Sequence, residues 1–160
     1  SRAAAAWLVS QLPVAAKFQV YSFNTRASAV GEGGMKRWLS ATEPGDIQSV
    51  TKGLGTVVPE DGTSLYAAFK AAGALSPKPD NILLITDSLP TQGRSKPGST
   101  TVTAEQRLKH FEQAVKTLPA GIPVNTILMP MEGDAWAAAA YWRLAVDTSG
   151  AFMTPARDWP

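Results

Sequence analysis

The stretch that decides the fold is Asn81-Ile82-Leu83-Leu84-Ile85-Thr86-Asp87-Ser88-Leu89-Pro90. Four consecutive aliphatic residues form an apolar run of strand length, and the run ends at a carboxylate. A strand that is apolar on both faces is typical of a parallel sheet covered by helices on both sides. A carboxylate at the carboxyl end of such a strand lies where open α/β sheets bind ligands. Any ligand site at this edge therefore depends on which residues surround Asp87.

The composition is that of one globular domain. The 160 residues, 44% of them hydrophobic and 18% charged, are enough to build a sizeable core. The net charge is only +2, and no cluster of Lys and Arg is interleaved with aromatic residues, so a nucleic-acid partner is not expected. The lack of cysteine excludes disulfides, thiolate metal sites and a Cys nucleophile. No apolar run approaches the roughly 18 residues of a membrane span.

Helical and strand-like segments alternate along the chain. Helices are expected at residues 2–12, 46–54, 64–75, 104–118 and 134–148, and strands at 17–23, 27–30, 81–86, 123–129 and 151–154. Thr103 and Gln106 have the spacing of a capping box, while Thr63 and Asp134 are expected to cap the helices that follow them. Gly150 is expected as the residue just past the last helix. This order predicts a three-layer α/β domain over residues 1–154, with a doubly wound, mostly parallel sheet, and a tail over residues 155–160.

Two oxygen-bearing side chains are expected at one edge of this sheet. Asp87 ends the central strand, and Thr63 lies in the loop that enters the preceding helix. Both loops belong to the carboxyl edge of a doubly wound sheet. A carboxylate and a hydroxyl are hard ligands that suit Mg²⁺, Mn²⁺ or Ca²⁺, although two ligands alone do not complete a site. A simpler role stays open for each residue, because Asp87 could merely end a strand and Thr63 could merely cap a helix.

Three segments also carry a resemblance to a known family. They are Asp61-Gly-Thr63-Ser-Leu-Tyr-Ala-Ala, Ile82-Leu-Leu-Ile-Thr86-Asp87 and Leu144-Ala-Val-Asp-Thr-Ser-Gly150-Ala-Phe. In their order and spacing, over nearly the whole chain, they resemble the von Willebrand factor A domain. The resemblance implies a Rossmann-like fold with a metal-ion-dependent adhesion site, in which Thr63 and Asp87 match the family's Thr and Asp ligands. It also implies an open metal position that is often filled by an acidic residue of a partner protein.

The chain departs from this family in its first strand. The family's Asp-x-Ser-x-Ser loop, which follows that strand, is absent from these 160 residues. The resemblance places the strand centrally, between the strands expected at residues 17–23 and 81–86. Without it these two would stand about 10 Å apart, twice the usual spacing, with unpaired backbone groups on both inner edges. We therefore expect that the strand and its loop lie outside this sequence, or that another segment fills the position. A smaller departure is Asp87-Ser88, where the family more often has Asp-Gly.

Three classes of function follow from these observations. The first is a metal-dependent protein-binding module for adhesion or assembly. The second is a scaffold subunit of a larger complex, with the same fold and no working metal site. The third, a hydrolase or nucleotide-binding enzyme, is the least favoured, because the sequence has neither a Gly-rich phosphate loop nor a Gly-x-Ser-x-Gly elbow. The compartment stays open between the cytoplasm and the bacterial cell envelope, where members of the resembled family are often tethered.

Overall fold

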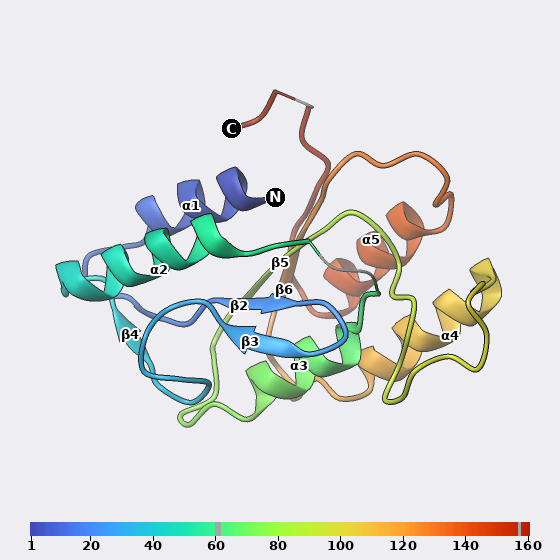
Figure 1. The fold of residues 1–160 in the computed structure, drawn as a ribbon, viewed down its shortest axis with the longest axis horizontal. Coiled ribbons are helices and arrows are strands. Elements are labelled where there is room, and N and C mark those ends of the chain that lie inside the picture. The colour runs from blue at the N-terminus through green and yellow to red at the C-terminus, as the bar shows by residue number, and fades with distance from the viewer. Residues whose placement is uncertain (60–61, 157) are drawn as a thin grey trace.

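The computed structural model describes residues 1–59, 62–156 and 158–160 and shows a mixed α/β fold (Figure 1). No helix in these ranges is long and apolar enough to cross a bilayer. The elements follow one another in the order α1 (Arg2–Ser10), β1 (Lys17–Phe18), β2 (Tyr21–Phe23), β3 (Ala27–Ala29), β4 (Leu39–Ser40), α2 (Pro44–Thr56), α3 (Leu65–Gly73), β5 (Ile82–Thr86), α4 (Ala104–Val115), β6 (Val124–Leu128), α5 (Ala137–Asp147) and β7 (Phe152–Met153).

The second half of the chain forms a parallel sheet in the order β5-β6-β7. Its register runs from Ile82 opposite Val124 to Thr86 opposite Leu128. The helices α3, α4 and α5 pack with these strands around one core cluster, whose buried members include Leu65, Phe69, Leu84, Leu89, Phe111, Val124, Leu128, Tyr141 and Leu144. Alternation of helices with parallel strands, as the sequence predicts, is confirmed for this part.

The first half is built differently. Two short antiparallel pairs, β1 with β4 and β2 with β3, replace longer strands. The strand predicted at residues 17–23 is split into β1 and β2. At the break the side chain of Gln19 accepts the Val20 N–H (2.8 Å) and donates to the carbonyl of Arg37 (2.7 Å), in place of strand pairing. Helices α1 and α2 pack on one another over a second core cluster of Val9, Phe18, Leu39, Val50 and Leu54.

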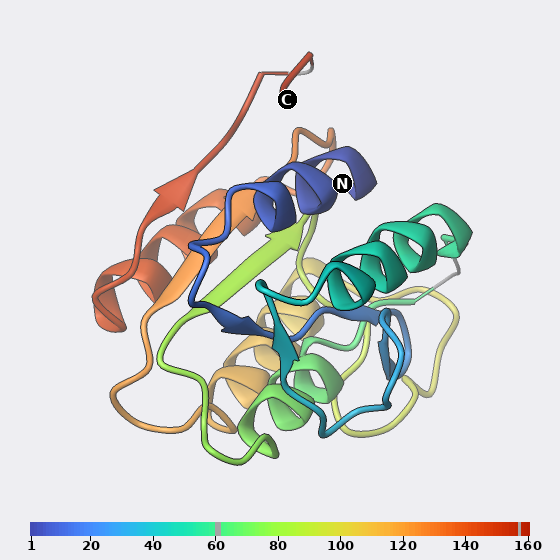
Figure 2. The ribbon, with the colours of Figure 1, turned by 90° about the vertical axis from the view of Figure 1, so that its left-hand side faces the viewer.

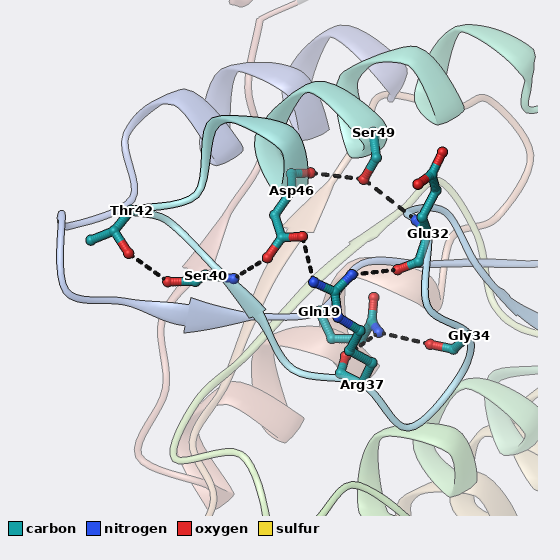
Figure 3. A network of polar contacts seen from close by, with 8 residues as sticks. All are labelled: Gln19, Glu32, Gly34, Arg37, Ser40, Thr42, Asp46 and Ser49. Atoms are coloured by element: carbon teal, nitrogen blue, oxygen red, sulfur yellow. Dashed lines mark hydrogen bonds and ion pairs between the residues drawn. The ribbon is translucent and has the colours of Figure 1, made fainter.

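A polar network fixes the long loop between β3 and β4 (Figure 3). The carboxylate of Asp46, in the first turn of α2, accepts the Ser40 N–H (2.9 Å) and pairs with the Arg37 guanidinium (2.8 Å). Arg37 also donates to the carbonyl of Glu32 (3.3 Å), so one guanidinium ties both ends of the loop. The bond from Ser40 and then the neighbouring Arg37 lower the pKa of Asp46.

The strands β2 and β5 do not pair, and within the described residues the strands form three separate sheets. The Ile82 N–H bonds to the Pro123 carbonyl beside β6 (3.0 Å), so by alternation the backbone groups of Leu83 and Ile85 point away from β6. This is the open edge of β5. Leu83 is 50% exposed whereas Leu84 is 4% exposed, so the expected burial on both faces is wrong at Leu83, while Ile85 on the same face is half-buried. Helices α1 and α2 pack over the second core cluster, and Leu83 belongs to neither cluster.

Helix ends match the sequence in one case and shift in three. The capping box of α4 is confirmed, since Thr103 Oγ1 accepts the Gln106 N–H and Gln106 Oε1 accepts the Thr103 N–H. The N-cap of α3 is Ser64 rather than Thr63, and the N-cap of α5 is Trp136 rather than Asp134. Beyond α5 the left-handed residue is Ser149 (φ 58°) rather than Gly150. Position 150 needs glycine for another reason, because a Cβ there would lie 2.1 Å from the Val124 carbonyl oxygen.

Candidate metal and partner site at the carboxyl edge

The loop after β5 presents one exposed carboxylate from an otherwise buried segment. Asp87 is exposed, whereas Ser88, Leu89 and Pro90 are buried directly behind it. The hydroxyl of Thr86 donates to the Ser88 carbonyl (3.2 Å), and the Ser88 hydroxyl donates to Asp87 Oδ1 (3.1 Å). Asp87 directly follows β5, as the sequence predicts, but β5 is an edge strand of the described three-stranded sheet and not its centre.

A buried clamp, formed by Arg107, Asp134 and Tyr141, holds this loop from three sides. Asp134 Oδ2 accepts the Leu89 N–H (2.7 Å) and pairs with Arg107 Nη2 (2.8 Å), which also donates to the Leu89 carbonyl (2.6 Å). The hydroxyl of Tyr141 donates to the Ser88 carbonyl (2.8 Å). Burial raises the pKa of Tyr141, so this hydroxyl remains a neutral donor. The carbonyls of Ser88 and Leu89 and the N–H of Leu89 are therefore all hydrogen-bonded to side chains. These side chains come from α4, from α5 and from the loop before α5.

The sequence did not reveal this clamp. Asp134 looked like a helix cap, but its carboxylate is turned to the loop after β5 and its side chain is only 4% exposed. No pattern in the sequence assigns a role to Arg107. Two residues so far apart in the sequence carry no spacing signal. The sole hint is that Arg107 lies four residues before Phe111 and seven before Ala114, the buried residues of α4, and so shares their side of the helix.

Thr63 lies against the same loop. Its N–H bonds to the Thr91 hydroxyl (2.8 Å), and its carbonyl accepts the N–H groups of Thr91 (2.9 Å) and Gln92 (3.2 Å). The two loops predicted to share an edge do meet, through residues four and five positions beyond Asp87. Thr63 is half-buried, and its helix-capping role falls instead to Ser64. Asp61, which belongs to the quoted motif, lies outside the described residues.

The turn after β2 reaches the same edge. The carbonyl of Asn24 accepts the Ser64 N–H (2.6 Å), and the carbonyl of Thr25 accepts from Gln92 Nε2 (3.4 Å). The carboxyl ends of β2 and β5 and the start of α3 therefore converge. In open α/β sheets, ligands bind where the carboxyl ends of the strands meet in this way.

The chemistry available at this edge is that of hard oxygen donors. Asp87 supplies a carboxylate and Thr63 a hydroxyl, both of the type that Mg²⁺, Mn²⁺ and Ca²⁺ prefer. Within the part of the chain that the structure describes, no three His, Cys, Asp or Glu side chains are grouped closely enough to hold a metal ion. A cation bound by Thr63 and Asp87 would take its remaining ligands from water, from nearby hydroxyl or carbonyl oxygens, or from another polypeptide segment.

Comparison with known proteins adds no relative to this picture. No protein-family model matches the chain, and no curated protein matches its sequence.

Proposed function

We propose that the chain is a von Willebrand factor A-like protein-binding module with a divalent-cation site at the carboxyl edge of its sheet. Thr63 and Asp87 are the ligands that the described residues contribute. The observation that carries the proposal is that Asp87, which directly follows β5, is exposed on a loop whose next three residues are buried. A bound cation would supply a coordination position for an acidic side chain of a partner protein.

The clamp supports this role. A loop that needed only to connect β5 to α4 would not require a buried ion pair and a buried tyrosine to fix two consecutive carbonyls. Binding sites gain from such rigid support because the ligand geometry is then set before binding. Asp134 holds the loop through Oδ2, which pairs with Arg107 and accepts the Leu89 N–H.

The open edge of β5 supports the doubly wound form of the proposal. Both β2 and the β5 residue Leu84 pack with α3, yet the two strands do not pair. One further strand between them, parallel to β5, would join the separate sheets and satisfy the backbone groups of Leu83 and Ile85. Figure 2 shows that α1 starts on the side of the carboxyl end of β5 and runs back across the molecule. Helices that connect parallel strands start near the carboxyl end of the strands, so the course of α1 fits a doubly wound sheet.

The test is thermal unfolding with and without about 10 mM Mn²⁺. A cation that binds only the folded chain with a Kd of about 1 mM stabilises it by about 1.4 kcal/mol at this concentration, which raises Tm by several degrees. Asp87→Ala and Thr63→Val should remove most of this shift, and Asp147→Ala, which changes an exposed carboxylate on α5, should retain it. Equal shifts in native chain and Asp87→Ala, or no shift in either, would contradict the metal site and favour a scaffold subunit without one.

A further inference from the structure

A shallow surface path follows α3 and is bordered by basic side chains. Its first part is a groove of about 350 Å³ between α3 and the turn of the β2–β3 hairpin, which Figure 1 shows side by side. Its second part is a hollow of about 390 Å³ that shares Lys70 and Ala74 with the first and extends to Lys78. We call the two together the α3 path.

The floor of the α3 path is apolar and its border is positive. Side chains of Met35, Ala67 and Ala71 line the first groove. Arg26, Lys70 and Arg94 border it from three different segments, and no Asp or Glu lines either part. Among the described residues no carboxylate lies within ion-pair distance of these three cations. Within the described ranges these three cations therefore have no ion-pair partner, and Lys70 Nζ lies 6.0 Å from the centre of the Tyr66 ring.

The α3 path begins at the carboxyl edge of the sheet. Ser64, which lines the first groove, donates to the Gly93 carbonyl (3.0 Å) in the loop after β5, and Arg94 is the next residue. A partner that engages Asp87 can therefore continue along α3 without leaving the surface.

From this arrangement we infer that the α3 path binds an extended acidic segment of a partner protein. Such cations favour carboxylates and speed their association, and the apolar floor accepts the side chains between them. Two adjoining shallow hollows fit an extended polypeptide better than one compact ligand, since small-molecule sites are deeper and enclosed. The inference rests on the proposed function for the identity of the partner as a protein, but the path itself requires no metal.

The probe for the test is a fluorescein-labelled ten-residue peptide in which Asp or Glu alternates with Leu or Ala, followed by anisotropy. The triple variant Arg26→Glu/Lys70→Glu/Arg94→Glu should weaken its binding at least tenfold. The matched control Lys17→Glu/Lys52→Glu/Lys109→Glu changes the net charge equally with exposed lysines of β1, α2 and α4 and should change binding less than threefold. Binding should weaken steeply as salt rises. Circular dichroism verifies that both variants fold.

The opposing outcomes are distinct. If both triple variants lost the same peptide affinity, the loss would be explained by net charge alone, and the α3 path would be overturned. Equal binding of a peptide with Asn and Gln in place of Asp and Glu would overturn the acidic partner, and displacement by millimolar citrate or phosphate would assign the site to small anions. Peptide binding that survives Asp87→Ala supports the path whether or not the metal site exists. Loss in Asp87→Ala alone, with the triple variant unaffected, would move recognition to the carboxyl edge and overturn the path.

Discussion

The region from α3 to β7 and the region from α1 to α2 solve the same packing problem differently. The α3–β7 region has three strands in parallel register, and its loop after β5 is fixed by a buried ion pair and a buried tyrosine. The α1–α2 region has strands of two or three residues, and its long loop is fixed by the Asp46 network near the surface. Each region has its own core cluster.

The difference between the two regions indicates which of them holds the candidate site in place. The candidate ligands Thr63 and Asp87 belong to the α3–β7 region, and all clamp residues do too. The α1–α2 region reaches the site only through the turn after β2, by the Asn24 and Thr25 carbonyls. Between the regions lies the open edge of β5. We therefore expect the α3–β7 region to determine the geometry of the site. The position of the α1–α2 region should depend on the contacts that connect it to the open edge of β5.

The largest effect is expected from breaking the clamp. Asp134→Ala would leave the Arg107 guanidinium buried without its carboxylate and the Leu89 N–H without an acceptor. Removing one partner of a buried pair typically costs about 3–5 kcal/mol. Urea unfolding followed by circular dichroism measures the change in the free energy of unfolding.

The control for the clamp is Asp147→Ala, which breaks the exposed pair with Arg143 on α5. Exposed pairs contribute about 0–1 kcal/mol, so this change should be small. If both variants lost the same stability, the clamp would be no more important than a surface pair, and the contrast between the regions would fail.

Two adjacent residues of β5 test its open face. Leu84→Ala removes a side chain from the α3–β7 core and should cost about 2–5 kcal/mol. Leu83→Ala, at the half-exposed neighbour, should cost less than about 1 kcal/mol. Unfolding in urea compares the two, and a loss for Leu83→Ala as large as for Leu84→Ala would show that its face is covered in solution.

The smallest effect is expected in the α1–α2 region, at Asp46. Its pKa is lower in the folded chain than in the unfolded chain, so the unfolded chain binds the proton more tightly. The stability from Asp46 is therefore full above about pH 4 and is lost as the pH falls through its folded pKa. The native chain should lose more stability from pH 7 to pH 3 than Asp46→Asn does, as urea midpoints at both pH values would show. Parallel losses would contradict the assignment.

The sequence predicts the features that depend on local residue patterns. It misses the contacts between residues that lie far apart in the chain. The aliphatic run at residues 82–85, the capping box at Thr103 and the parallel alternation around β5 and β6 all follow from local patterns. The shared edge of the Thr63 loop and the loop after Asp87 followed from topology. The role of Asp134 could not be predicted, because it depends on Arg107 and Leu89, which lie elsewhere in the chain. The split of the 17–23 strand was equally hidden, since it depends on one side chain, Gln19, that competes for backbone hydrogen bonds.

The most direct test of the central claim is paramagnetic line broadening by Mn²⁺ in the ¹⁵N-labelled chain, because it detects weak binding residue by residue. At substoichiometric Mn²⁺ the amides of Thr63, Asp87 and Ser88 should broaden first, and Asp87→Asn should abolish this while Asp147→Asn leaves it intact. Broadening spread evenly over exposed carboxylates, or unchanged by Asp87→Asn, would contradict a cation site shared by Thr63 and Asp87.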